Sequence, residues 1–143
     1  PELAPIYAPK TSLLRRIEDQ QREIMANSAV LSAMLAREWK LPEDLYIALR
    51  HSLTPLTWSP DESERSEAEQ REDVLLYLAC RVGDAVAYAG LRDLADFDIF
   101  EEDTSDFFYL QDYVRRLELG SLLDVLQDPK RCRRIKQTLS TFG

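Results

Sequence analysis

The sequence is poor in the residues that carry most metal-dependent and nucleophilic chemistry. Its 143 residues include one His and two Cys, which excludes a zinc finger or a multi-histidine metal centre built from this chain alone. Four Gly leave little room for the turns of an all-β fold or for a glycine-rich phosphate loop. No apolar run approaches the roughly 20 residues that cross a bilayer. We expect no metal ion and no other cofactor.

Positive charge is also in deficit. The chain has 18 basic and 26 acidic residues and a formal net charge of −8, so we expect neither nucleic acid nor a membrane as its main partner. Cys80 and Cys132 lie far apart, and nothing in the sequence requires a disulfide between them. Reduced thiols and the lack of a signal-peptide pattern favour a cytoplasmic location. Because the chain begins with Pro1, we expect a segment of a longer protein.

What is present predicts a helical domain. Hydrophobic residues make up 45% of the chain, enough for a core, and they recur at helical rather than strand spacing. We expect one all-α domain over 1–143, a compact bundle of about six or seven short helices. The same reasoning predicts an extended N-terminal strap at 1–10, a polar loop at 56–66 and an acidic loop at 91–103.

Helix starts are marked by side chains that can accept hydrogen bonds from free backbone N–H groups. Candidate caps, in chain order, are Thr11 or Ser12, Asn27 or Ser28, Ser66 with Glu69, Thr104 or Ser105, and Asp128 before Pro129. The helix after Ser66 is strongly apolar and stops at Gly90, so we expect it at the centre of the fold. Alanines at 26, 29, 33 and 36 predict that the second helix packs closely on a neighbour.

The charged and titratable candidates for a site are weak. His51 has Ser52 rather than Asp beside it, so we expect a helix C-terminus there, where a charged imidazole is favourable, and no metal pair. The acidic segment 93–106 lacks the Gly that an EF-hand needs at its sixth position, which indicates a solvated loop. The basic run 130–136 has no interleaved aromatic residues for nucleic acid, and an anionic protein or phosphate suits it better.

The two tryptophans and the serines complete the candidates. Trp39 ends an apolar stripe and is expected in the core, whereas Trp58 lies in a proline-bounded loop and is a candidate contact residue. No Gly-x-Ser-x-Gly motif is present, and a single His would have to serve every base role. We therefore expect that the chain is not an enzyme.

Residues 31–55 resemble the C-terminal half of the HDOD domain, a helical relative of HD-type phosphohydrolases. In that family a helix ends in Leu-Ala-x-x-Trp-Gly-Leu-Pro, and residues 35–42 here read Leu-Ala-Arg-Glu-Trp-Lys-Leu-Pro. A short acidic helix and a turn with His51 and Pro55 follow, as in the family. The segment around Asp84 resembles an Ala-Asp pair on the family's next helix. Lys40 replaces a Gly of the family. The family's His-x-x-Val-Gly block falls near Ser28 to Ser32, where both its His and its Gly are missing, and its usual His pair maps near Ser52 and Leu53.

The resemblance implies an HDOD-like fold and a non-catalytic, regulatory role in bacterial signal transduction, through binding of another protein. The residues that we single out for binding are Trp58, His51, Trp39 and Asp84. One alternative is a sensor for a nucleotide or cyclic dinucleotide, with a pocket between the long helix and the helix ending at Trp39. A second is a vestigial HD-type phosphohydrolase.

Overall fold

The computed structural model describes residues 12–88, 94–100 and 105–142 of the chain, so the strap predicted at 1–10 lies outside the described residues. Within these ranges the regular elements are all helical, and the predicted all-α fold is confirmed. In chain order they are α1 (Leu13–Ile24), α2 (Ser28–Glu38), α3 (Glu43–His51), α4 (Thr54–Thr57), α5 (Glu67–Tyr88), the 3-10 helix η2 (Leu94–Asp96), α6 (Phe108–Arg116), α7 (Ser121–Gln127) and α8 (Pro129–Phe142).

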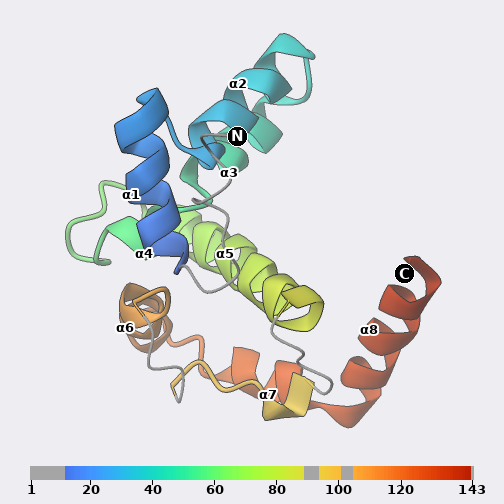
Figure 1. Ribbon diagram of the computed structural model, residues 1–143. Coiled ribbons are helices and arrows are strands. Elements are labelled where there is room, and N and C mark those ends of the chain that lie inside the picture. Colours follow the sequence, from blue (N-terminus) through green and yellow to red (C-terminus); the bar gives the residue numbers. More distant parts are fainter. Residues whose placement is uncertain (1–11, 89–93, 101–104, 143) are drawn as a thin grey trace.

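The long helix α5 runs through the middle of the molecule, as predicted, with α1 and α4 on one side and α6 on another (Figure 1). Its buried residues Val74, Tyr77 and Leu78 belong to a single hydrophobic core. Residues of α1, α4, α6 and the segment after η2 complete this core: Leu13, Ile17, Leu56, Phe97, Ile99, Phe107, Leu110, Tyr113, Val114 and Leu117. Neither α2 nor α3 contributes a residue to it.

Two of the predicted loops are more ordered and more apolar than expected. The polar loop at 56–66 overlaps α4, and Leu56 lies in the core with 2% of its surface exposed. In the acidic loop, Leu94–Asp96 form η2, and Phe97 and Ile99 after it lie in the core. Isolated apolar residues carry no periodicity, so only their tertiary contacts identify them as core. Phe108, the first residue of α6, is 64% exposed although Phe107 before it is buried.

Most predicted helix starts are confirmed by hydrogen bonds. The Ser12 hydroxyl accepts from the Arg15 amide, and the Asn27 side chain accepts from the Val30 amide. Ser66 and Glu69 form the predicted capping box: the Glu69 carboxylate accepts from the Ser66 amide at 2.9 Å. At α8 the Asp128 carboxylate accepts from the Lys130 amide. The exception is α6, which begins after Phe107 without a side-chain cap, so Ser105 does not cap it.

Asp106, just before α6, instead caps a helix that is distant in sequence. Its carboxylate accepts hydrogen bonds from the backbone amides of Leu13 and Leu14 at 2.8 and 3.0 Å. The backbone carbonyl of Asp106 accepts from the hydroxyl of the buried Tyr77 on α5 at 2.8 Å. A carboxylate at a helix N-terminus satisfies free N–H groups and also favours the helix dipole. Asp106 therefore joins the starts of α1 and α6 to the middle of α5.

We predict that Asp106→Ala lowers the free energy of unfolding by about 1–2 kcal/mol, because two helix N–H groups lose a charged acceptor. Urea denaturation followed by circular dichroism measures this change. The matched control is Asp112→Ala, which removes a carboxylate whose salt bridge within the described residues is with Arg115, three residues later. It should cost less than about 0.5 kcal/mol. Equal losses in the two variants would contradict the proposed role of Asp106.

Candidate functional site

The helices α2 and α3 form a hairpin that rises above the core (Figure 1). They pack against each other more extensively than any other two elements of the described chain. The turn between them is closed by hydrogen bonds from the Lys40 amide to the Arg37 carbonyl and from the Leu41 amide to the Ala36 carbonyl, each 3.0 Å. Lys40 has a φ of 56°, the left-handed conformation that usually ends a helix at Gly.

Small side chains hold α2 against its neighbour. The buried residues of α2 are Ala29, Ala33 and Ala36, spaced four and three residues apart on one face. This confirms the predicted close packing for three of the four alanines, since Ala26 precedes the helix and is half-buried. Because alanine fills little space, it lets two helix axes approach. The larger apolar residues of α2 are left on its other faces.

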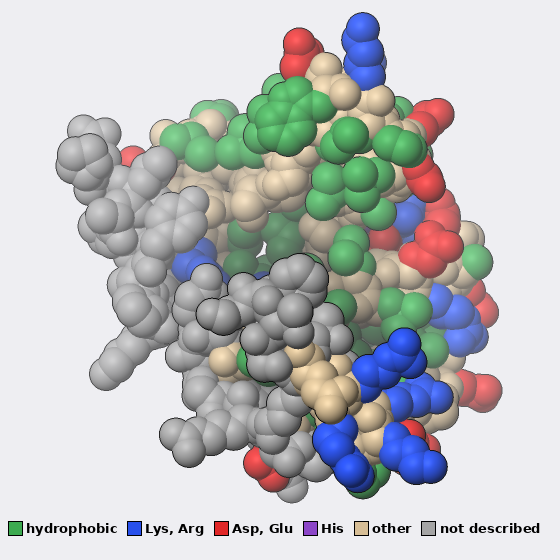
Figure 2. Space-filling view, turned by 90° about the vertical axis from the view of Figure 1, so that its right-hand side faces the viewer, with side chains coloured by type: hydrophobic (Ala, Val, Ile, Leu, Met, Phe, Trp, Pro, Cys, Tyr) green, Lys and Arg blue, Asp and Glu red, His purple; other side chains and the backbone are tan. Residues whose placement is uncertain are grey.

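Those larger side chains form an exposed surface, which we call the apolar face. It consists of Val30, Leu31, Met34, Leu35, Trp39, Leu41 and Leu45. Figure 2 shows hydrophobic side chains gathered at the height where Figure 1 places α2 and α3. Met34 is 61% exposed and Trp39 is 69% exposed. Contiguous exposed apolar side chains are typical of surfaces that bind other molecules.

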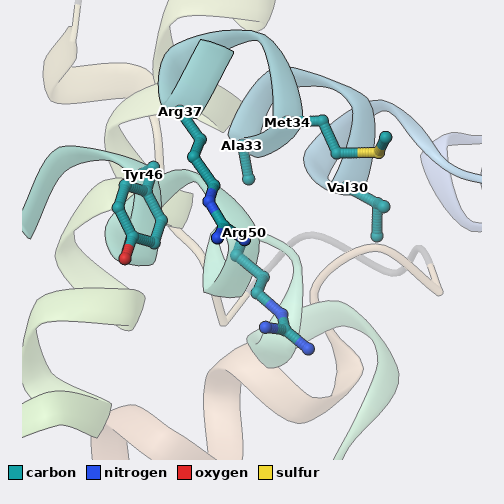
Figure 3. Close-up of a pocket in the computed structure, with 6 residues that line it drawn as sticks. All are labelled: Val30, Ala33, Met34, Arg37, Tyr46 and Arg50. Carbon is teal, nitrogen blue, oxygen red and sulfur yellow. The ribbon is translucent and has the colours of Figure 1, made fainter. Parts of the chain in front are cut away.

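A cavity of about 170 Å³ opens between α2 and α3 at the edge of the apolar face. Its lining residues are Val30, Ala33, Met34, Arg37, Tyr46 and Arg50 (Figure 3). Val30 and Met34 belong both to the cavity and to the apolar face, so the two are continuous. An apolar cavity of about 150 Å³ is large enough for benzene, and this one therefore suits one large side chain or a small ligand.

The charged groups of the cavity are both arginines. Arg37 comes from α2 and Arg50 from α3, and both are exposed. Among the residues that the structure describes, no carboxylate lies within salt-bridge distance of either guanidinium. Seven other arginines form such pairs, as Arg81 does with Asp84. The Tyr46 hydroxyl donates to the Glu43 carboxylate at 3.0 Å, and this hydrogen bond raises the pKa of Tyr46.

The four residues singled out from the sequence do not come together. Trp39 caps the C-terminus of α2. It precedes α3, which is about 13 Å long, and His51 is the last residue of that helix. Trp58 follows α4 and is 55% exposed, as expected for a contact residue. Asp84 lies on α5, where it pairs with Arg81 at 2.9 Å. The placement of Trp39 in the core was wrong, because alanines rather than large residues form the buried side of α2.

His51 lies at the C-terminus of α3, as predicted, but its charged form is not favoured there. Burial lowers the pKa of His51 below 6.5, and the nearby Arg65 acts in the same direction while Asp73 opposes it. His51 is close enough to Asp73 to interact with its charge, and Asp73 is about 16 Å along α5 from Asp84. His51 and Asp84 therefore do not share a site. The expectation of a charged imidazole interacting with the helix dipole is therefore wrong.

A polar cluster beside His51 was not anticipated. The Arg65 guanidinium donates to both oxygens of Asp73, at 3.0 and 3.2 Å, and to Glu69 at 2.8 Å. Asp73 is buried, and burial raises its pKa while Arg65 opposes that change. The buried Gln70 amide donates to the carbonyls of Pro60 and Arg65. These bonds attach the loop before α5 to the helix itself, so we interpret the cluster as structural.

The polar cavity residues that the sequence did not indicate are Arg37, Tyr46 and Arg50. The turn at 39–42 separates Arg37 from the other two, and nothing in their spacing predicts a shared cavity. A signal for the apolar face was available, because α2 carries apolar residues on every side. Such a helix needs more than one neighbour to cover it. That pattern, together with the buried alanines, indicates a surface available for binding.

Other functional classes find little support in the described residues. In 12–88, 94–100 and 105–142 no three His, Cys, Asp or Glu side chains are grouped as metal ligands would be. No helix in those ranges is long and apolar enough to cross a membrane. Cys80 is exposed, Cys132 is buried, and no disulfide joins them. Comparison with protein-family models, curated proteins and solved structures found no match to this chain.

We predict that the single imidazole titrates below pH 6.5 in the folded chain, because burial and Arg65 disfavour its charged form. A proton NMR titration of the one His ring measures this pKa directly. The unfolded chain then binds more protons than the folded chain near pH 6, so the free energy of unfolding rises as the pH rises through that window. A His51→Gln variant should lose this rise. A measured pKa at or above 6.5 contradicts the described environment.

Proposed function

We propose that this chain is a non-catalytic helical domain that binds another protein through the apolar face of α2 and α3. The observation that carries the proposal is the exposure of Leu31, Met34, Leu35 and Trp39 in a chain that has a separate core. Burying a Leu or Met side chain is worth about 1.5–3 kcal/mol. Only a molecule from outside the hairpin can recover that energy without unfolding it. A large exposed Trp at the end of the face suits an interface anchor.

We further propose that the domain is of HDOD type and has a regulatory role in bacterial signalling. The stretch that carries the resemblance, 35–42, forms the end of α2 and the turn into α3. Lys40, which stands where the family has Gly, has the left-handed backbone that Gly adopts most readily. Trp39 and Leu41 belong both to this stretch and to the apolar face. The resemblance and the exposed surface thus coincide on the same residues.

The described side chains favour binding over hydrolysis. His51 is half-buried with a lowered pKa, and its acidic neighbour Asp73 accepts from Arg65 through both oxygens. Metal-assisted hydrolysis needs several ligands around one ion, and the described residues contain no such group. The sensor hypothesis placed a pocket between α5 and α2, whereas the cavity described above is lined by α2 and α3.

We predict that a displayed library of amphipathic helices about 20 residues long yields peptides that bind this chain, and that Leu31→Gln with Leu35→Gln weakens them at least about tenfold. Gln keeps helix propensity and adds no charge, so the double variant should fold as the wild type does. Fluorescence anisotropy with labelled peptides measures the affinities.

The matched control for this experiment is Leu75→Gln, which changes an exposed leucine on α5 that belongs neither to the apolar face nor to the cavity. It should bind the same peptides as tightly as the wild type. If no peptide is enriched, or if the enriched peptides bind the double variant unchanged, the apolar face is not a protein-binding surface.

A further inference from the structure

We propose that the partner segment is an acidic amphipathic helix, whose apolar side chains cover the apolar face and whose carboxylates pair with Arg37 and Arg50. This inference rests on the proposed function and specifies the chemistry of the partner. It follows from the charge of the cavity, from the kind of backbone that the surface can accept, and from the position of the arginines beside the apolar residues.

The two arginines concentrate positive charge at one place in an acidic chain. The chain has a formal net charge of −8, and several arginines on other helices, such as Arg15, Arg81 and Arg115, lie within 4 Å of a carboxylate. In the described part of the structure, Arg37 and Arg50 have no such neighbour although they line one cavity. Two like charges on one cavity raise its affinity for an anion, and a guanidinium pairs with a carboxylate through two parallel hydrogen bonds.

Figure 3 shows how the two side chains lie. Arg37 and Arg50 extend from different helices toward the same side of the cavity, and the Tyr46 hydroxyl is on the side of its ring away from them. The Glu43 carboxylate accepts from this hydroxyl, and within the described residues it forms no salt bridge with Arg37 or Arg50. Val30 and Met34 form the opposite, apolar wall. An incoming group thus meets apolar atoms on one side and guanidinium groups on the other.

The surface can accept a helix but gives no support to an extended segment. Both α2 and α3 bond their own backbone groups internally, so they offer no row of free N–H and C=O groups for a strand. A partner that satisfies its own backbone is required, and a helix does so while projecting side chains at i, i+3, i+4 and i+7. Arg37 follows Met34 by three residues on α2, so the guanidinium group and the apolar Met34 side chain lie on one side of that helix.

The experiment uses the helix library on three versions of the chain. Peptides selected on the wild type should carry Asp or Glu beside their apolar positions, and their affinity should fall severalfold between about 50 and about 500 mM salt. Arg37→Glu with Arg50→Glu should weaken them at least about tenfold, and selection on this variant should return Lys or Arg at the same positions. Arg22→Glu with Arg131→Glu, on α1 and α8, changes the net charge equally and should bind as the wild type does.

A second variant, Arg37→Gln with Arg50→Gln, keeps the test informative if charge reversal disturbs folding, and it too should weaken the acidic peptides. Selected peptides without acidic preference, bound equally by both cavity variants, would overturn this inference and leave the proposed function standing. Failure to select any peptide would contradict both the inference and the proposed function.

Vesicles of phosphatidylserine and a cyclic dinucleotide serve as further probes. Binding of either one through Arg37 and Arg50 in place of acidic peptides would overturn the inference.

Discussion

The hydrogen bonds of Asp106 and Tyr77 bring three distant parts of the chain to one place. The Asp106 carboxylate caps the start of α1, its backbone carbonyl accepts a hydrogen bond from the Tyr77 hydroxyl, and α6 begins two residues later. The apolar residues of α1, α5 and α6 are then buried together in one core. Because the polar groups at this junction are satisfied, the core can close over them without leaving a buried backbone N–H group unpaired.

The position of that core explains why α2 and α3 leave large apolar side chains exposed. The hairpin contributes nothing to the core, and its own buried side consists of alanines. Alanine burial stabilises less than burial of larger side chains, but it brings two helices close and turns Leu31, Met34 and Leu35 outward. The small residues on one side of α2 thus leave the exposed apolar face on the other.

The charged side chains divide into two groups with different roles. The ion pair between Arg65 and Asp73 is satisfied on both sides and attaches the loop before α5 to the body of the protein. Breaking such a buried pair leaves a charge without its partner, so its role is structural. Arg37 and Arg50 are exposed, lie next to apolar residues and, within the described residues, have no carboxylate in reach. Their charge is available to an incoming anion.

The HDOD resemblance remains a proposal, and the structure makes its residues easier to interpret. The Trp-Lys-Leu-Pro stretch forms the turn of the hairpin, where the left-handed Lys40 stands at the position that the family gives to Gly. The resemblance was found in a local pattern because a helix end and the turn after it are encoded by neighbouring residues. It carries no information on which distant side chains approach this turn.

Local chemistry was sufficient for the helical class, the caps at Ser12, Asn27 and Ser66, and the alanine side of α2, because each depends on residues within one or two turns. Burial of Phe97, exposure of Trp39, capping of α1 by Asp106 and the meeting of Arg37 with Arg50 depend instead on which elements pack together. A side chain of given type is stable inside or outside according to its neighbours in space, and only the tertiary structure supplies those neighbours.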